Sequence, residues 1–369
     1  MKRAIFAVAG SLLAAGLLAQ VPAPAGKTVE QELQTYAMQY LPFDPESKIT
    51  VEKSSQVLPG FQGYKVTRKG RYEKLNVVDR IVYVSLDRKW FFAGDSVTNT
   101  APRPVHRAAD LDWVEERYKK AFSRAVQAVL VPERDAAGLK GAALQMNTGY
   151  MPVRMPGYVS PDGRAYFQGS VWDFAADPRA ERRRRIDLSA NRATGPADAR
   201  VTMAEFADME CGYCKMRGLQ LDHLLEANAG VVAVRRHYKF FPLWLGHVWA
   251  MKAASAADCL FPFAGQAMFA FKGSVYARQE SMTVAGIDEL ALQAAEAAGV
   301  RNDDFLSCYL RDESFARIRK DIEEGYRLGV LATPTYFVDG TEVNWLEDKV
   351  MEDFLRTLFP KVKTITYGK

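Results

Sequence analysis

Cysteine and histidine are scarce in this sequence: each occurs only four times in 369 residues. Two of the cysteines form the Cys-x-x-Cys motif Cys211 to Cys214, and neither a second such motif nor a His-x₃₋₅-His pair accompanies it. His237 and His247 are too scattered to form a recognised zinc-ligand spacing. We therefore expect no metal centre and no bound cofactor.

Excess charge and long apolar runs are also lacking. The net charge of +5 is small for this length, so we expect no nucleic-acid partner. The one long apolar run, Ala4 to Ala19, follows Lys2 and Arg3 and predicts a signal peptide over residues 1–22. It is shorter than the ~20 residues that span a bilayer, although an uncleaved anchor remains an alternative. We expect a periplasmic or secreted protein, in which disulfides persist.

The apolar residues that are present, 48% of the chain, are enough for the cores of two or three domains. Helical spacing predicts one helix over Thr28 to Leu41, with Thr28 as its N-cap, and another over Asp110 to Leu130. Alternating segments with turn residues predict strands and hairpins after each helix. The front of the chain therefore reads as an α+β region.

Two of the predicted hairpins are similar in sequence. The segment YVSLDRKWFFAGDSV from Tyr83 aligns without gaps on YVSPDGRAYFQGSVW from Tyr158. We interpret this as an internal duplication of a helix-plus-hairpin unit, with repeats over residues 27–105 and 106–178. The alternative is convergence, because aromatic hairpins with Asp-Gly-type turns arise easily.

A polar, charged segment over residues 179–199 closes on Gly195 and Pro196 and predicts a linker or an exposed helix between domains. The run Arg182 to Arg185 invites a nucleic-acid or membrane interpretation. A solvated tether is favoured instead, because no basic surface or interleaved aromatic residue extends the run.

Residues 200–369 have the pattern of a small α/β domain. The apolar strand VTMAEFA, the amphipathic segment from Cys214 to Gly230 and the strand VVAVRRHYKFF predict a βαβ unit with a parallel strand pair. A helix-rich insertion follows over about 248–329, and TPTYFVDGTEV predicts a final hairpin before a closing helix near Asp348 to Leu358.

The Cys-x-x-Cys motif lies where this strand gives way to a helix. Free N–H groups and the positive end of the helix dipole stabilise a thiolate there, so Cys211 is predicted to be the attacking sulfur. Cys214, three residues along, is predicted to resolve the mixed disulfide. An inert structural disulfide is the alternative, but its small loop would add little stability.

The motif and its surroundings resemble the DsbA-like branch of the thioredoxin fold. The resemblance rests on EFADMECGYC, on KFFPLWLGHVWAMKAASAADC and on the later TPTYFVDG, and it covers nearly half of the chain. It implies that Pro334 is a cis-proline facing the cysteine pair, and that Thr333 presents its backbone to an extended substrate. The alternative for Pro334 is an ordinary turn proline. Gly212 and Tyr213 are expected to contact substrate and to set the redox poise.

The resemblance implies roles for three further residues. Glu205 matches a buried acidic position of the family, from which a carboxylate takes the proton of Cys214; the alternative is a surface residue on an edge strand. Cys259 and Cys308 match a structural disulfide, which would add on the order of 4 kcal/mol by chain entropy. The alternative is two buried free thiols.

The front half contains the segment GYVSPDGRAYFQGSVWDF, which resembles the dimerisation domain of the DsbC and DsbG isomerases. The motif CGYC also resembles the version of the motif found in these isomerases. The front half departs from that dimerisation domain in length, and a pair of repeats within one chain weakens the expectation of a homodimer. Together the resemblances imply an exported thiol-disulfide oxidoreductase that forms, isomerises or reduces disulfides. Its expected partners are cysteine-containing secreted proteins and a membrane or periplasmic redox protein.

Two other functions remain open from the sequence. One is a periplasmic chaperone or binding module whose Cys-x-x-Cys disulfide is not catalytic. The other is a reductase dedicated to one partner, such as an apocytochrome. These alternatives share the same motif and differ in whether Cys211 forms mixed disulfides and with what range of proteins.

Overall fold

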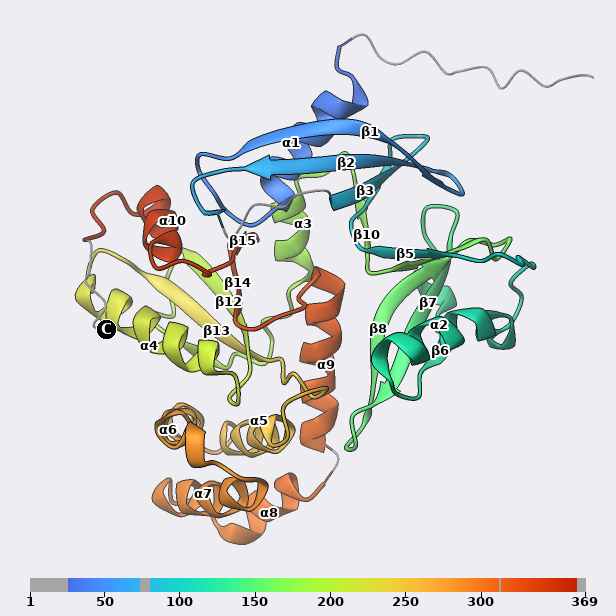
Figure 1. Cartoon of the computed structure of the whole chain (residues 1–369). Helices are drawn as coiled ribbons and strands as arrows, with labels where there is room; N and C mark the ends of the chain where they lie inside the picture. The colour runs from blue at the N-terminus through green and yellow to red at the C-terminus, as the bar shows by residue number, and fades with distance from the viewer. Residues whose placement is uncertain (1–25, 74–79, 312, 364–369) are drawn as a thin grey trace, which may run out of the picture.

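The computed structural model describes residues 26–73, 80–311 and 313–363, and the predicted signal peptide lies outside them. Within these ranges, three five-stranded sheets organise the chain, two in the front half (residues 26–178) and one in the C-terminal half (from residue 186). Figure 1 shows the two halves side by side, with the long helix α9 (Glu313–Leu328) between them. Within the described residues, no helix is both long and apolar enough to cross a membrane.

The first sheet has the strand order β1-β2-β3-β4-β10 and is packed against helix α1 (Val29–Tyr40). Thr28 caps α1 as predicted, in a reciprocal capping box with Gln31. Leu33, Tyr36 and Tyr40 are the buried face of the helix. The strands are β1 (Lys48–Leu58), β2 (Phe61–Lys69), β3 (Arg80–Ser85), β4 (Trp90–Phe92) and β10 (Val171–Asp173).

The second sheet has the order β5-β9-β8-β7-β6 and carries helix α2 (Asp112–Phe122). Its strands are β5 (Asp95–Thr98), β6 (Gln127–Leu130), β7 (Lys140–Asn147), β8 (Pro152–Val159) and β9 (Ala165–Gln168). The predicted helix over Asp110 to Leu130 is wrong at its C-terminal end. Ser123 takes a left-handed backbone, φ 52°, which ends α2, and the apolar residues after it form β6, which pairs with β7.

In the two sheets, the two predicted repeat units exchange their last strands. The final strand of the first unit, β5, pairs with β9 of the second, and the final strand of the second unit, β10, pairs with β4 of the first. The registers are equivalent: Ser96 pairs with Phe167, and its counterpart Val171 pairs with Phe92. The counterparts Phe92 and Phe167 meet edge to face, 5.1 Å between ring centroids.

The aligned turns repeat the same hydrogen bonds. Ser85 Oγ donates to Asp87 at 2.6 Å, and Ser160 Oγ donates to Asp162 at 2.7 Å. The following left-handed position is Arg88 in one turn and Gly163 in the other, at φ 60° and 71°. Equal geometry at equal sequence positions favours duplication over convergence.

The segment predicted as a solvated tether instead begins with helix α3 (Pro178–Arg185), which packs between the halves. Arg182 is 1% exposed and donates to the carbonyl oxygen of Tyr40 at 2.6 Å and to Glu342 at 3.4 Å. Arg185 stacks over Trp172 at 4.0 Å. The prediction of a solvated Arg182–Arg185 run is therefore wrong for these two residues, because apolar and acidic partners from both halves surround them; Arg183 and Arg184 are exposed.

The third sheet, in the C-terminal half, has the order β11-β13-β12-β14-β15, with β12 and β13 parallel as predicted. Helix α10 (Val350–Leu358) and the C-terminal part of α4 (Gly212–Ala227) pack on one face, and α9 packs on the other. The strands are β11 (Ala193–Thr194), β12 (Val201–Ala207), β13 (Val234–Phe240), β14 (Thr335–Val338) and β15 (Thr341–Val343).

Among the described residues, five α-helices are inserted between β13 and β14, as predicted for about 248–329. The first four form a layer below the sheet in Figure 1, and the fifth runs up beside the sheet. Their bounds are α5 (Ala250–Leu260), α6 (Gly265–Ala277), α7 (Val284–Ala297), α8 (Asn302–Tyr309) and α9 (Glu313–Leu328). The mixed α/β class and the thioredoxin-type βαβ-plus-hairpin order are those that the sequence predicts.

The two halves are joined by polar and aromatic contacts in addition to α3. These contacts place the front half directly against the C-terminal half. They include Phe43 N to Glu342 O at 2.7 Å, Tyr72 Oη to Asp353 at 2.6 Å, Arg154 N to Glu323 at 3.1 Å and the Tyr150–Phe315 ring pair at 5.0 Å.

Candidate active site

The cysteine pair lies at the junction between β12 and α4. Strand β12 ends at Ala207, and Cys211 is the N-cap of α4 with an extended backbone, so the free N–H groups of the first helical turn surround its sulfur. Both thiols are free in this structure; Cys211 is 7% exposed and Cys214 is 0% exposed. Of the two, only Cys211 is accessible to an incoming sulfur.

The surroundings favour the thiolate of Cys211. A hydrogen bond from Cys214, with further hydrogen bonding to Thr333 and to the backbone N–H of Cys214, outweighs burial and lowers the pKa of Cys211 to about 6. In its thiol form Cys211 donates to the carbonyl oxygen of Thr333 at 3.3 Å. Most of the Cys211 sulfur is therefore ionised at neutral pH.

Cys214 has the opposite character. Complete burial, followed by the hydrogen bond and the charge of Cys211, raises the pKa of Cys214 well above its ordinary value. The backbone N–H of Asp208 lies 3.4 Å from its sulfur. Cys211 is thus the accessible sulfur that favours the thiolate, and Cys214 is the enclosed sulfur that favours the thiol. This difference fits the predicted roles of Cys211 in attack and of Cys214 in resolution.

A polar cluster in the loop before Cys211 was not predicted. The buried carboxylate of Asp208 accepts from the backbone N–H of Leu243 at 2.7 Å and contacts Nδ1 of His247 at 2.6 Å. The hydrogen bond to Asp208 raises the pKa of His247, and the negative charges of Glu210 and Cys211 act in the same direction. These neighbours favour the protonated form of His247, a residue outside the motif.

Glu210 holds the neighbouring helix in place. Its carboxylate accepts from the backbone N–H groups of Val248, Trp249 and Ala250 at 2.7–3.0 Å, which are orphan donors at the start of α5. The loop that carries the cysteines is thus bonded to the first turn of the helical insertion.

Glu205 lies on β12, the central strand of the sheet, and is 0% exposed, which excludes the edge-strand alternative. It forms an ion pair with Arg236 on β13, with 2.7 Å between Nε and Oε2, and Tyr336 lies 3.5 Å away. Burial alone would raise the pKa of Glu205, but Arg236 and Lys272 outweigh burial and lower it. A paired carboxylate of low pKa is a weak base.

The loop before β14 completes the site. The peptide bond between Thr333 and Pro334 is cis, and Thr333 contacts Cys211 through its carbonyl oxygen. Gly212 and Tyr213 begin α4, and Tyr213 is 62% exposed beside the cysteine pair. The structure thus brings together the motif, Thr333 and Pro334, which are more than 110 residues apart in the sequence.

Cys259 on α5 and Cys308 on α8 form a disulfide with 5.7 Å between their Cα atoms. They belong to the helical insertion and take no part in the cysteine pair at the start of α4. Among the described residues, no group of three or more His, Cys, Asp or Glu side chains is arranged to hold a metal ion.

Asp208, His247 and Arg236 are members of the site that the sequence did not predict. From residue spacing, His247 could be considered only as a possible metal ligand. The Gly-His pair that follows Phe-Phe-Pro-Leu does, however, belong to the family pattern. The signal that would have found the cluster is an acidic residue three positions before the motif with a histidine in the next loop of the βαβ unit.

Similarity to curated proteins is confined to part of the chain. The sodium/proton antiporter NhaA 3 of Salinispora tropica is 31% identical over 159 residues, which is 42% of this chain and 22% of the antiporter. The NhaA antiporter of Herminiimonas arsenicoxydans is 29% identical over 161 residues, 42% of this chain and 23% of that protein. The chain thus spans about a fifth of the length of these relatives.

Solved structures of similar fold match the same extent of chain. The α-DsbA2 thiol-disulfide exchange protein of Wolbachia pipientis is 18% identical with a TM-score of 0.39, covering 50% of this chain and 99% of that one. Oxidised BdbD of Bacillus subtilis is 17% identical with a TM-score of 0.40, covering 46% and 94%. Values this low carry no argument about activity.

A family model described as thioredoxin matches residues 188–357. This range contains the third sheet, the cysteine pair at the start of α4, the cis peptide bond before β14 and the inserted helices. Residues 188–357 are therefore a thioredoxin-family domain with a helical insertion between β13 and β14.

Proposed function

We propose that the chain catalyses thiol-disulfide exchange on polypeptides through Cys211 and Cys214. The observation that carries this proposal is the asymmetry of the pair: Cys211 has a pKa lowered to about 6 at a helix start, while Cys214 is enclosed and has a raised pKa. An inert structural disulfide has no need of an ionised sulfur.

The exchange proceeds in two steps that balance. The Cys211 thiolate attacks one sulfur of a substrate disulfide; a Cys211–substrate disulfide forms, and the other substrate sulfur leaves as a thiolate that takes a proton from solvent. Cys214 then loses its proton and attacks Cys211, which releases the second substrate thiol. Two electrons pass from the pair to the substrate, and the reverse sequence oxidises a substrate dithiol. Isomerisation follows when a substrate thiol resolves the intermediate.

Exposed apolar side chains surround the cysteine pair and support a polypeptide substrate. Leu331 precedes Thr333 on the cis-proline loop, and Leu245 and Val248 flank His247 on the loop that contacts Asp208. These side chains are 41–74% exposed, and Tyr213 adds a fourth at 62%. Backbone pairing to the Thr333 loop, with apolar contacts around it, fits an extended, incompletely folded chain.

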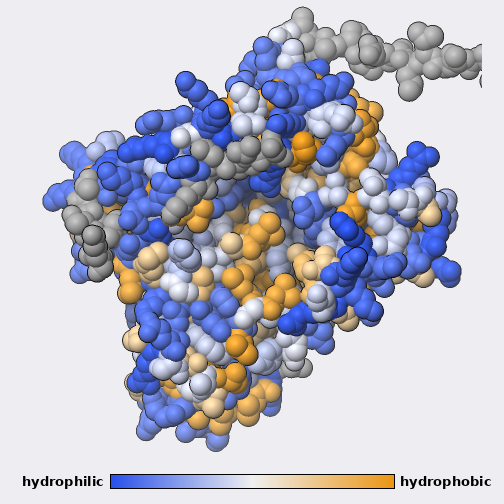
Figure 2. All heavy atoms as spheres, in the orientation of Figure 1, coloured by the Kyte–Doolittle hydropathy of each residue, from blue (hydrophilic) through white to orange (hydrophobic). Residues whose placement is uncertain are grey.

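The front half is proposed to hold the client. A cleft of about 750 Å³ lies between the halves, lined by residues of both, from Tyr83 and Met155 to Tyr326 and Leu331. Figure 2 shows the hollow in the middle of the molecule, with apolar residues on its floor. Because Leu331 belongs to both the cleft and the cis-proline loop, a chain in the cleft reaches the cysteine pair.

Export and the redox partner are part of the proposal. The charged and then apolar start of the sequence supports an exported protein, whose compartment permits disulfides. The pair then needs a second dithiol-disulfide protein, membrane-bound or periplasmic, to return it to its starting state. That partner's potential decides whether oxidation, isomerisation or reduction dominates.

Trapping of mixed disulfides tests the proposal. Cys214→Ala leaves Cys211 able to attack but unable to be resolved within the chain, so adducts that reductant releases should accumulate on Cys211. Mass spectrometry identifies the attached proteins, and Cys211→Ala is the control that should carry none. An absence of adducts, with full chaperone activity in Cys211→Ala, would establish the binding module with a non-catalytic Cys-x-x-Cys instead. Adducts to a single protein would establish a dedicated reductase.

A further inference from the structure

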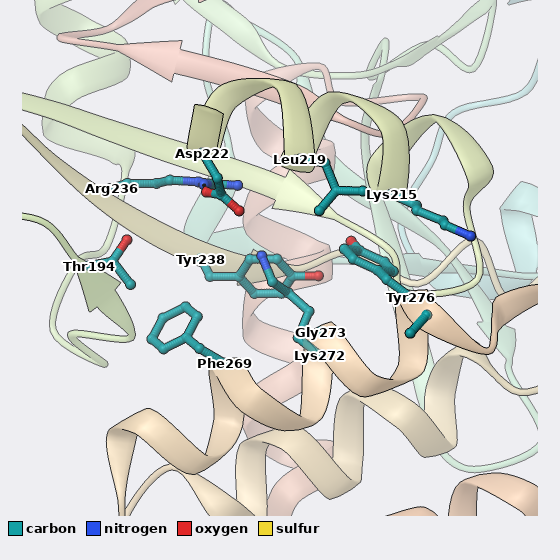
Figure 3. Close-up of a pocket in the computed structure, with 12 residues that line it drawn as sticks. Thr194, Lys215, Leu219, Asp222, Arg236, Tyr238, Phe269, Lys272, Gly273 and Tyr276 are labelled. Carbon is teal, nitrogen blue, oxygen red and sulfur yellow. Dashed lines mark hydrogen bonds and ion pairs between the residues drawn. The ribbon is translucent and has the colours of Figure 1, made fainter. Parts of the chain in front are cut away.

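A second cavity lies between α4 and α6, and neither cysteine is among the residues that line it. It has a volume of about 320 Å³. Helix α4 provides one wall through Lys215, Leu219 and Asp222, and helix α6 provides the opposite wall through Phe269 and Lys272 (Figure 3). The redox chemistry proposed above uses none of these side chains.

Lys272 is a buried cation that lines this cavity. It is 8% exposed, and its ammonium lies 5.1, 5.6 and 5.9 Å from the ring centroids of Tyr238, Tyr276 and Phe269. Within the described part of the chain, no carboxylate forms an ion pair with it. Burial and the charge of Arg236 lower the pKa of Lys272 and outweigh Glu205 and Asp222, which favour its charged form from a distance. Aromatic faces offset only part of the cost of burying an ammonium, and among the described residues the ammonium has no carboxylate in direct contact.

The polar groups around the cavity also include a hydrogen-bond donor that has no acceptor. Arg236 bonds Glu205 through Nε at 2.7 Å and Asp222 through Nη1, while its Nη2 has no hydrogen-bond partner among the described residues. The buried hydroxyls of Tyr238 and Tyr276 interact with each other and leave the Arg236 donor unpaired. The one carboxylate that lines the cavity, Asp222, is already paired with Arg236. The missing partner is an acceptor.

The shape of the cavity limits the size and polarity of that acceptor. Rings of Tyr238, Tyr276 and Phe269 and the side chain of Leu219 make most of its wall apolar. Gly218 also lines the cavity; a Cβ at this position would make ordinary contact, at 3.8 Å, with Arg236 Nη2 and the Tyr276 ring, so only a longer side chain would compete with a ligand for the space. A compact molecule with one negative group and an apolar body fits such a site.

We propose that the cavity between α4 and α6 binds a small organic carboxylate, whose carboxylate group pairs with the ammonium of Lys272 and whose apolar body packs between Tyr276, Phe269 and Leu219. The site is separate from the client surface around Tyr213 and Leu331. It does not depend on the thiol chemistry of Cys211.

Binding of 4-fluorobenzoate to the full chain, followed by ¹⁹F NMR, tests this proposal. The neutral analogue 4-fluorobenzamide has nearly the same shape and should bind at least tenfold more weakly, a difference of about 1.4 kcal/mol. Lys272→Met keeps the length and apolar stem of the side chain and should cause a similar loss. Gly218→Leu, which places a side chain in the cavity, should abolish binding.

Lys320→Met is the matched control, because this lysine is exposed on α9 and should leave binding unchanged. Cys211→Ser should also bind normally, which separates this site from the redox proposal. Equal binding of acid and amide, or full binding in Lys272→Met with an unchanged melting temperature, would overturn the proposal. Binding of 4-fluorobenzoate to a Gly218→Leu variant that is folded by circular dichroism would overturn it as well.

Discussion

Cys211 is ionised because of neighbours on two segments: Cys214 and its backbone N–H in the first turn of α4, and the side chain of Thr333 on the loop before β14. The first of these contributes most to the lowered pKa. The sulfur therefore combines a local helix effect with a contact that only the folded chain provides.

The rate of alkylation of Cys211 should report this ionisation. Because only the thiolate reacts, the rate with iodoacetamide should rise with pH through a midpoint near 6. Cys214→Ala removes the strongest hydrogen bond to the thiolate, so its midpoint should move to higher pH. A wild-type midpoint at the ordinary value of a free thiol would contradict the assignment of Cys211 as the attacking sulfur.

His247 should stabilise the fold most strongly when it is protonated. The hydrogen bond to Asp208 raises its folded pKa above the unfolded value, so its contribution is complete below the unfolded pKa and disappears as pH rises through the folded pKa. His247→Gln should therefore cost about 1 kcal/mol in free energy of unfolding near pH 5.5. The cost should be much smaller at pH 9.

Urea unfolding at the two pH values measures this difference, with His223→Gln, an exposed histidine on α4, as the control. If the loss of unfolding free energy in His247→Gln does not change with pH, the contact between His247 and Asp208 is held by packing rather than by charge.

At the scale of single elements, helix α3 is partly buried, although its sequence predicts a solvated segment. A run of four arginines predicts a solvated segment, yet Arg182 is enclosed by Tyr40, Trp172, Phe337 and Glu342, which come from both halves. Composition alone cannot reveal such partners, because they lie at least ten residues away along the chain and mostly more than 100.

Replacement of Arg182 by methionine should destabilise the protein by about 3 kcal/mol, since it leaves the half-buried Glu342 without its cation and the Tyr40 carbonyl without a donor. Arg183→Met, one residue along on the exposed side of α3, should change stability by no more than about 0.5 kcal/mol. Chemical denaturation measures both variants. Equal stability of the two would mean that α3 does not join the halves.

The end of α2 illustrates a related difficulty. The residues from Val126 to Leu130 continue an apolar pattern that a helix or a strand could use, and pairing with β7 decides in favour of a strand. Short apolar runs carry little information on period, so the tertiary partner determines the element.

For the whole molecule, the exchanged strands bear on oligomeric state. The edges of β4 and β9 are occupied by β10 and β5 of the same chain, so two repeats complete each other within one molecule. A second copy is not needed to cover these edges.

We therefore expect a monomer in solution. Light scattering on a sizing column should give a mass near 41 kDa for the full chain, or slightly less after removal of the predicted signal peptide. Phe92→Ala, at the contact between the repeats, should cost about 3–4 kcal/mol in stability without creating a dimer. A concentration-dependent mass of twice this value in the wild type would contradict the expectation.

The sequence by itself was sufficient for the small α/β domain, the start of α4 at the cysteine pair and the inserted helices, because each depends on local signals: apolar period, caps, turn residues and a spaced motif. The thioredoxin type of this domain was implied by the resemblance of its motifs to a known family. The sequence also indicated the duplication, although not the exchange of β5 and β10. Only the tertiary structure placed His247 against Asp208, paired Glu205 with Arg236, and buried Arg182 between the halves. These contacts join residues 31–160 positions apart, and such pairings are decided by how the layers pack rather than by any local pattern.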